Sequence, residues 1–396
     1  MRETDWLFAA EAISGEITAL REALHRRPEL GNQEFETAAL IEKTLQGCGI
    51  QTARVLDTAV IGTLTGAQPG PCAALRADVD ALPVTEETGA ACASQVPGVM
   101  HACGHDVHTA AALGAAMLLS KRRDALCGTV KFLFQPDEEG TGGARRMIAA
   151  GCMEGVAAIF GAHVAPELPL GHVGVRYGKF YAASDTFRIV VRGKSCHGAT
   201  PEKGIDALAA VCELTLRLKR LPEELGEPCV LTVGTLRAGT AINVLAGEAE
   251  LTGILRTLGK DSRAYMKRRL RETARAIEDA TGAAIDVILH ESYPGIVNHD
   301  AQTARVRRVA ARILGEGAVT ELEKPTMTTE DFGFFLDQTP GAFYHIGAGC
   351  DSPLHSARFF PDARAAVTAS ALHAAILADV LEHPSADKAD LKGSIA

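Results

Sequence analysis

The chain has 396 residues, which is long for one hydrophobic core, so we expect two domains. Hydrophobic residues make up 47% of it and charged residues 22%, as in soluble globular proteins. Its 40 basic and 49 acidic residues give a formal net charge of -9 without a basic tract, which argues against nucleic acid and anionic membranes as partners.

The N-terminal stretch and the cysteines indicate a cellular compartment. MRETDWLFAAEAISGE carries charges throughout and lacks the apolar segment of a secretory signal. No apolar run reaches the roughly 20 residues of a membrane-spanning helix. The ten cysteines are scattered, and no pair has CxxC spacing, which argues against a structural zinc site or a thioredoxin-type site. We therefore expect a cytoplasmic protein with reduced thiols.

The first 180 or so residues alternate between strand-like and helix-like stretches. This alternation is typical of an α/β domain with a mostly parallel sheet, whose functional residues gather past the carboxyl ends of the strands. Asp106 is a plausible N-cap of the helix in this part. The predicted elements are strands at 58–66, 71–83, 128–137 and 156–164, and a helix at 106–123.

The alternating pattern of strand-like and helix-like stretches changes near residue 184. The order β-α-β-β-α-β then matches a ferredoxin-like unit, so 184–294 is predicted to be a domain inserted into a catalytic domain made of 1–183 and 295–396. Its predicted elements are strands at 186–194, 229–239, 242–258 and 283–292 and helices at 204–221 and 262–282. After this unit, the elements typical of an α/β domain return, with a predicted helix at 300–315, a strand at 342–349 and a helix at 363–383.

The stretch HACGHDVH, residues 101–108, concentrates potential metal ligands. Cys103 and His105 are two residues apart, so in an extended chain they point the same way. Thiolate and imidazole suit zinc and related ions. A lone C-x-H pair is weak support for a metal site, so the remaining ligands have to come from elsewhere.

Further candidates lie downstream. Glu138 and Glu139 follow an apolar strand, His163 ends another, and His355 lies in a late loop. Each has a plain structural alternative, a solvated acidic turn or a buried histidine. Together with HACGHDVH they can complete a site for two divalent ions about 3.5–4 Å apart, with the thiolate as a bridge. The glycines after Glu139 are expected to give a substrate-accessible loop.

The whole pattern resembles the metal-dependent amidohydrolase family of aminoacylases, hippurate hydrolases and indole-acetyl-amino-acid hydrolases, which are relatives of the glutamate carboxypeptidases. The similarity runs in the family's order from Leu24 to Phe360. The stretches that carry it are LHRRPELGNQEFET, LRADVDALPV, MHACGHDVHTA, LFQPDEEGTGGA, GAHV, GKSCHGATPEKGIDAL, INVLAGEAELTGILRT, TMTTEDFGFF and PLHSARFF.

The resemblance implies a fold and a metal centre. The fold is a zinc-peptidase-like α/β catalytic domain with an inserted ferredoxin-like α+β dimerisation or lid domain. Two divalent ions per subunit are implied, zinc or manganese first and cobalt or nickel also admissible. Glu138 is the implied general base. The implied metal ligands are Cys103, His105, Glu139, His163 and His355.

One ligand position departs from the related carboxypeptidases. Their H-x-D motif supplies a ligand histidine, whereas this chain has Asp78-Val79-Asp80 there, and His105 takes its place. His101 and His108 inherit no ligand role and are expected to support the site or pack against the helix.

The resemblance also assigns substrate-binding residues to the inserted domain. It implies that His197 contacts the substrate or the oxyanion across a homodimer interface. Asn243 and Arg256 match positions that bind the substrate carboxylate, for which a guanidinium fork is suited. The loop departs from the family at Ala246, where a proline is usual, and Cys196 receives no role.

The predicted function is metal-dependent hydrolysis of an N-acyl amino acid, by metal-activated water with Glu138 as the base. A dipeptidase or carboxypeptidase with the same dinuclear centre remains the alternative. A non-catalytic metal-dependent binding protein would be expected to have lost the base or a ligand, and this sequence keeps all of them.

Overall fold

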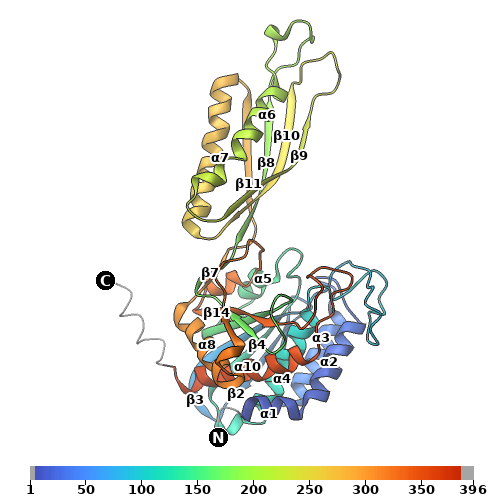
Figure 1. Cartoon of the computed structure of the whole chain (residues 1–396), viewed down its shortest axis with the longest axis vertical. Coiled ribbons are helices and arrows are strands. Elements are labelled where there is room, and N and C mark those ends of the chain that lie inside the picture. The colour runs from blue at the N-terminus through green and yellow to red at the C-terminus, as the bar shows by residue number, and fades with distance from the viewer. Residues whose placement is uncertain (1–4, 385–396) are drawn as a thin grey trace, which may run out of the picture. The chain divides into compact units, whose positions relative to one another are not determined.

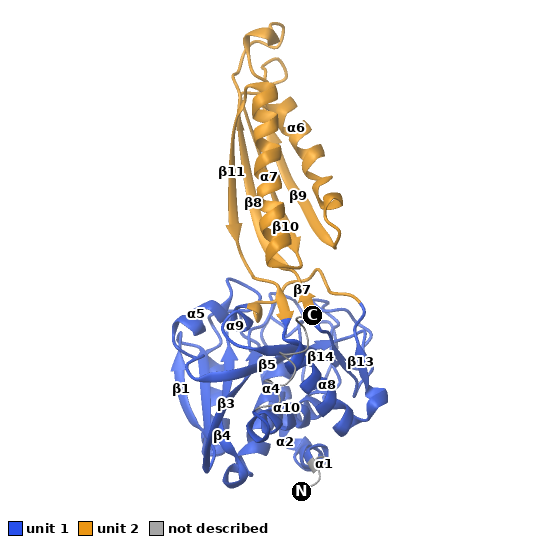
Figure 2. Cartoon of the chain, turned by 90° about the vertical axis from the view of Figure 1, so that its left-hand side faces the viewer, with its two compact units in different colours: residues 1–178, 298–323, 334–396 blue, residues 179–297, 324–333 orange. Residues whose placement is uncertain are grey.

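The structure is a computed structural model and describes residues 5–384 of the chain. It divides into two compact units, shown in different colours in Figure 2: residues 1–178, 298–323 and 334–396 form the first, and residues 179–297 and 324–333 form the second. The sequence predicted the second domain at 184–294 and left 324–333 in the flanking domain. That segment belongs with the second unit because its backbone pairs there, with Thr326 N–H donating to the Phe180 carbonyl (2.9 Å) and Ala182 N–H to the Thr328 carbonyl (3.1 Å).

The first unit is built on an eight-stranded mixed sheet (Figure 1). The expected parallel pairing holds at its centre, where β3 pairs with β4 and β5, and β5 with β14. The β1–β2 hairpin adds to β4 in antiparallel fashion, so the sheet is less parallel than the sequence predicted. The strands in sheet order are β1 Gln51–Val55, β2 Ala59–Thr65, β4 Cys127–Gln135, β3 Gln68–Asp78, β5 Val156–Ala165, β14 Gly341–Gly347, β6 Val173–Val175 and β13 Val319–Glu321.

Two helices, α4 and α10, pack against each other in the core of this unit. Every residue of α4 from His105 to Leu119 is buried. The contact is close because small residues face it: a Cβ on Gly114 would lie 2.2 Å from Ser370 Oγ. The helices are α1 Asp5–Ala12, α2 Ser14–Arg26, α3 Phe35–Gly47, α4 His105–Ser120, α5 Gly143–Ala149, α8 Asp300–Leu314, α9 Gly333–Leu336 and α10 Arg364–Glu382.

Helix α10 is the one helix among residues 5–384 that is long and apolar enough, by length and composition, to cross a membrane. Its most apolar window is 89% buried inside the fold. Packing in the core therefore accounts for its apolar composition.

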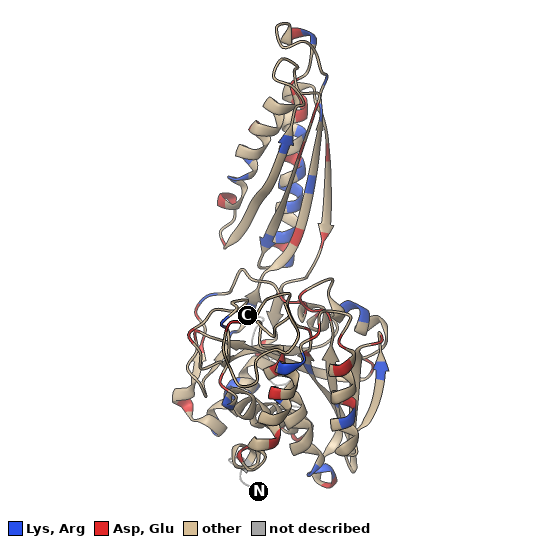
Figure 3. Ribbon diagram, turned by 90° about the vertical axis from the view of Figure 1, so that its right-hand side faces the viewer, with Lys and Arg blue, Asp and Glu red and all other residues tan. Residues whose placement is uncertain are grey.

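The second unit has the expected β-α-β-β-α-β order, with an antiparallel sheet in the order β11-β8-β10-β9 and the helices α6 and α7 packed against it. Helix α6 starts at an N-cap, Asp206, whose carboxylate accepts the N–H groups of Leu208 and Ala209. Basic and acidic residues are interspersed along α7 (Figure 3). The bounds are β8 Ala183–Arg192, α6 Ala207–Leu218, β9 Cys229–Ala238, β10 Glu248–Thr257, α7 Lys260–Thr281 and β11 Ala284–Glu291, and the short strands β7 Gly178–Tyr181 and β12 Ile296–Asn298 pair separately.

Candidate metal centre

The predicted metal ligands all lie in the first unit. His163 is in β5, Glu138 and Glu139 follow the end of β4, and Cys103 and His105 stand at the start of α4. This is the carboxyl end of the parallel central strands, where open α/β sheets carry their functional groups. The late loop brings His355 to the same place, since its N–H donates to the Ala102 carbonyl at 2.8 Å.

The Cys103 sulfur is common to two groups of potential ligand atoms. The donor atoms of Cys103, His105 and His163 lie within 4.8 Å of one another, and so do those of Cys103, Glu139 and His355. Cys103 Sγ is 3.3 Å from His163 Nε2, and Glu139 Oε1 is 3.1 Å from His355 Nε2. Two-metal sites hold their ions about 3.5–4 Å apart and need a bridging ligand, a role that a thiolate at this shared corner can take.

A left-handed glycine makes the turn that presents Cys103 and His105. Gly104 has φ 86° and is the N-cap residue of α4. A Cβ at this position would lie 2.5 Å from Val164 Cγ2, so both the backbone conformation and the packing require glycine. The turn thereby sets the thiol and the imidazole against β5.

The ring nitrogens of two histidines are oriented for metal binding. His163 Nδ1 donates to the Val164 carbonyl at 2.8 Å, which leaves Nε2 facing the Cys103 sulfur. His105 Nδ1 contacts Asp80 Oδ1 at 3.2 Å, and its buried Nε2 has no hydrogen-bond partner among the described residues. This nitrogen lies 3.8 Å from Asp78 Oδ2, beyond hydrogen-bond distance, so it can serve as a ligand atom, and the donor set fits a divalent metal.

The electrostatics of the cluster also call for a cation. Burial, reinforced by the negative charges of Glu139 and Glu138, raises the pKa of the Cys103 thiol. Burial acts to lower the pKa of His105, but Asp78 and Asp80 outweigh it and raise that pKa to about 10. Thiol and imidazole bind metal in their deprotonated forms, so a divalent ion would bind here in place of the protons that these pKa shifts favour.

The carboxylate and imidazole at the accessible side of the cluster form an ion pair. Burial acts to raise the pKa of Glu139, but its hydrogen bond with His355 and the positive charge on His105 outweigh it and lower that pKa. The same hydrogen bond raises the pKa of His355. The His355 side chain is 53% exposed while Glu139 is 17% exposed, so this corner is the one open to solvent.

Two aspartates that sequence reasoning treated only as a missing ligand hold the cluster together. Asp80 uses one oxygen for His105 and accepts the Glu139 N–H with the other at 3.0 Å. Asp78 Oδ1 contacts His108 Nδ1 at 2.6 Å, and His108 Nε2 accepts the Val164 N–H at 2.9 Å. Both nitrogens of His108 are thus occupied, so it orients the ligand strand and leaves metal binding to others. The available sequence signal was two aspartates, Asp78 and Asp80, at the end of an apolar strand.

The prediction that Asp106 caps α4 is wrong. Asp106 lies inside the first turn, is fully buried, and binds Arg21 Nε and His25 Nδ1, each at 2.8 Å. The interior of the fold offers these stronger charged partners from α2, while Gly104 takes the N-cap position. His101 is buried too, and burial lowers its pKa to about 3, so it packs as a neutral ring.

The predicted substrate-binding residues lie in the second unit. The structure brings His197 and Asn243 together: Gly198 N–H donates to the Asn243 carbonyl at 2.8 Å, and His197 forms a β-bridge with Val244. Both His197 and Asn243 are exposed. The expected strand at 242–258 begins only at Glu248, so Asn243 stands on a loop instead.

Arg256 stands apart from this pair, on β10. Its pKa is lowered by partial burial, and its buried Nη1 has no hydrogen-bond partner among the described residues. A guanidinium nitrogen in this state is available to an anionic ligand.

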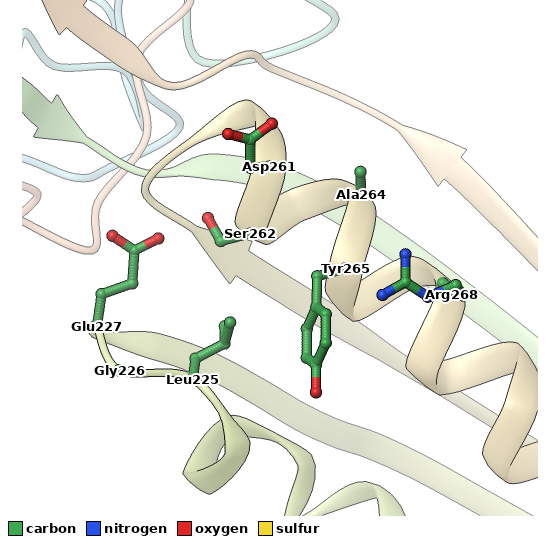
Figure 4. A pocket seen from close by; sticks show the side chains of 8 residues that line it. All are labelled: Leu225, Gly226, Glu227, Asp261, Ser262, Ala264, Tyr265 and Arg268. Carbon is green, nitrogen blue, oxygen red and sulfur yellow. The ribbon is translucent and has the colours of Figure 1, made fainter.

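A hollow of about 690 Å³ in the second unit is a separate feature. It lies between Leu225–Glu227 and the first turns of α7, where Asp261, Tyr265 and Arg268 line it (Figure 4). None of the predicted site residues lines it. Tyr265 donates its hydroxyl to Glu224, and the hollow holds no cluster of the residues that the sequence singled out, so it is not the candidate site.

A family model described as peptidase family M20/M25/M40 matches residues 74–382. The chain belongs to this family. The match confirms the predicted relationship to metal-dependent amidohydrolases and carboxypeptidases, the two-domain α/β fold and the classification of the protein as a hydrolase.

Relatives that are similar over most of the chain carry two kinds of name. An N-acetylcysteine deacetylase of Bacillus subtilis is 37% identical over 379 residues, covering 94% of this chain and 99% of the relative. Thermostable carboxypeptidase 1 of Saccharolobus solfataricus is 36% identical over 359 residues, covering 87% of this chain and 90% of the relative. The crystal structure of the Bacillus subtilis YXEP protein, described as a dinuclear metal binding peptidase from the M20 family, has a TM-score of 0.86 and 36% identity, covering 94% of this chain and 99% of that one.

Proposed function

We propose that this M20 enzyme hydrolyses the amide bond of N-acyl amino acids and releases a carboxylic acid and a free amino acid. The observation that carries the proposal is the cluster, buried except at His355, in which Cys103 is shared by two ligand groups beside Glu138. The similarity to a deacetylase of an N-acetyl amino acid supports the acyl substrate. The similarity to a carboxypeptidase keeps a dipeptidase or carboxypeptidase activity as the second candidate.

The metal ligands that we assign are Cys103, His105, Glu139, His163 and His355. Divalent ions held there would supply Lewis acidity toward the amide carbonyl and toward water. Thiolate, imidazole and carboxylate suit zinc first and also manganese, cobalt or nickel.

Glu138 is the proposed general base. It is buried, with a carboxylate oxygen within 4.8 Å of the donor atoms of His105 and Glu139. From this position it takes a proton from the attacking water and passes it to the leaving amine. The neighbouring Glu139 donates its N–H to Asp80 and pairs through its carboxylate with His355. The two adjacent glutamates can therefore have different roles, Glu138 as the base and Glu139 as a ligand.

The second unit is proposed to recognise the substrate carboxylate through Arg256 and Asn243, with His197 acting at the site of a partner subunit in a homodimer. The loop that carries Asn243 supports this proposal, because it exposes two apolar side chains, Ile242 and Val244, that a second chain could cover. The absence of a disulfide among the ten cysteines, all of which lie in the described residues, supports the proposed cytoplasmic location.

The proposed mechanism is tested by Glu138→Gln. The variant should keep two metal ions per chain and lose about 10²–10⁴-fold in kcat, the usual contribution of a general base. Turnover of N-acetyl amino acids and elemental analysis measure the two quantities. Glu139→Gln is the matched control, which should lose metal as well. A fully active Glu138→Gln enzyme would refute the mechanism.

The substrate class is tested by comparing N-acetyl and N-benzoyl amino acids with unblocked dipeptides, each with zinc, manganese, cobalt and nickel. We expect the blocked amino acids to have the higher kcat/KM. Preference for dipeptides would establish the second candidate function instead.

A further inference from the structure

The turn that carries the two adjacent glutamates starts at a residue in an unusual backbone conformation. Asp137 lies two residues after the end of β4 and has φ 57°, in the left-handed region that non-glycine residues seldom adopt. Glu138 and Glu139 come next, so their positions depend on this one dihedral angle. Such a conformation persists only where the surroundings hold it.

A buried carboxylate far away in the sequence holds the backbone of Asp137. Glu34, the N-cap residue of α3, is fully buried, and its Oε1 accepts the Asp137 N–H at 3.0 Å. Burial raises the pKa of Glu34 to about 7. Burial of a carboxyl group is unfavourable unless the group forms hydrogen bonds. Its bond to the Asp137 N–H is therefore a reason for Glu34 to be buried here.

The side chain of Asp137 closes the turn from the other side. Its Oδ2 accepts the Thr141 N–H at 3.2 Å and Arg146 Nη2 at 3.0 Å, and it also accepts the Thr141 hydroxyl. The carboxylate fits between two glycines: a Cβ would lie 2.4 Å from Asp137 Oδ1 at Gly31 and 2.1 Å from it at Gly140. Gly140 therefore makes room for Asp137, a reason for glycine that the sequence did not suggest.

The backbone carbonyl of Asp137 also forms hydrogen bonds within the turn. It accepts the N–H groups of Gly142 and Gly143 at 3.0 and 3.1 Å. The amide, the carbonyl and the carboxylate of one residue are thus all used to fix a single turn.

We propose that Glu34 and Asp137 are positioning residues, which set the backbone from which the base Glu138 and the metal ligand Glu139 project; the catalytic part of this inference rests on the proposed function. Glu34 fixes the turn through the Asp137 amide, and Asp137 fixes it through Thr141 and Arg146. A misplacement of about 1 Å in a catalytic group can cost about 10²-fold in rate, so small movements of this turn matter.

The test compares Glu34→Ala with Glu34→Gln. The glutamine oxygen can still accept the Asp137 N–H, whereas alanine leaves that amide without a partner. Glu29→Ala is the matched control, because Glu29 lies in the same segment and accepts the N–H groups of Glu36 (3.1 Å) and Thr37 (2.8 Å) at the start of α3. A general weakening of this segment would appear in both alanine variants.

Three readouts are measured on the full chain: hydrogen–deuterium exchange of a peptide spanning 137–143, the zinc affinity by competition with a chelating indicator, and kcat with KM on an N-acetyl amino acid. Glu34→Ala should exchange faster in that peptide, bind one of two zinc ions at least tenfold more weakly, and lose at least tenfold in kcat with KM within about threefold. Glu34→Gln and Glu29→Ala should stay within about threefold of the unmodified protein in affinity and kcat.

A second pair of variants tests the other half of the proposal. Asp137→Asn tolerates the left-handed conformation and retains an acceptor oxygen, so it should stay close to the unmodified protein, while Asp137→Ala should behave like Glu34→Ala. Equal behaviour of Glu34→Ala and Glu29→Ala in exchange and zinc affinity would overturn the inference. If the unmodified protein hydrolyses no N-acyl amino acid or dipeptide, the proposed function fails, and the exchange and zinc readouts still decide the positioning role.

Discussion

At the residue scale, the sequence could propose candidate ligands, but it could not reveal the buried contacts that hold them. Cys103, His105 and Glu139 stand in short stretches with recognisable chemistry, so the sequence alone proposes them. Glu34 reaches Asp137 across 103 positions, and no local pattern marks such a contact. Asp106 shows the same limit, because its position before an apolar stripe predicted a helix cap, yet its partners come from another helix.

Glu34 should make stability depend on pH. Its pKa rises from 4.5 to about 7 on folding, so between these values the folded state binds the proton more tightly than the unfolded state. The free energy of unfolding therefore falls as pH rises through this window, by about 3 kcal/mol in all. Urea denaturation of metal-free protein at pH 5 and pH 8 should show this loss relative to Glu34→Gln. Parallel pH dependence of the two proteins would contradict it.

Gly140→Ala should be destabilising because the added Cβ would lie 2.1 Å from Asp137 Oδ1. Overpacking of this kind costs about 1–3 kcal/mol in free energy of unfolding. Gly317→Ala is the control, since a Cβ there meets nothing within 4 Å, and it should change stability by less than about 0.5 kcal/mol. Denaturant titration measures both, and equal stability of the two variants would disprove the steric explanation.

At the scale of elements, sequence patterns predicted helices α4, α6, α7, α8 and α10 and most strands. Helices α1–α3 were missed, and the ends of the predicted elements depended on tertiary contacts. Helix α4 was expected from its alanine-rich run, but it starts at His105 because Gly104 turns the chain there. The segment at 242–247 has strand-like residues, yet it forms a loop and places Asn243 in solvent. Exposed apolar residues such as Ile242 carry the same local signal as strand residues.

Asp106→Ala tests what anchors α4. The change would leave Arg21, which is 1% exposed, as a buried charge without its carboxylate. Removing one partner of a buried ion pair costs about 3–5 kcal/mol in free energy of unfolding. Glu42→Ala, which removes the partly exposed pair with Arg54, should cost less than about 1 kcal/mol. A similar small loss in both variants, measured by denaturation, would show that the Asp106 pair contributes little.

At the scale of the whole molecule, the change in the pattern of elements near residue 184 led us to expect an α+β unit inserted into an α/β unit. The return of 324–333 to the second unit was not predictable, because this short segment has no periodicity of its own and is held by backbone pairing with Phe180 and Ala182. Periodic sequence patterns reveal helices and strands that pack one face against a core. A segment that is held only by main-chain hydrogen bonds has no such pattern.

The proposed homodimer leads to a complementation experiment. Glu138→Gln and His197→Ala chains are each expected to be inactive, but a mixed dimer would pair an intact Glu138 with an intact His197 at one of its sites if His197 acts in trans. Random mixing of symmetric dimers should then restore about a quarter of the activity. Hydrolysis assays after verified subunit exchange measure this recovery. No recovery would mean that His197 acts within its own chain or has no part in catalysis.

The path of the chain also constrains the order in which the protein can be assembled. Because the second unit takes strands from 179–297 and a final segment from 324–333, it stays incomplete until the chain has left it once and returned. The first unit is completed later still, because its last helix, α10, ends only at Glu382. During synthesis the second unit can therefore be completed only after residue 333, and the first only after residue 382. Grafting the second unit onto another scaffold would accordingly require both segments, because 179–297 alone would leave the backbone groups of Phe180 and Ala182 without their partners.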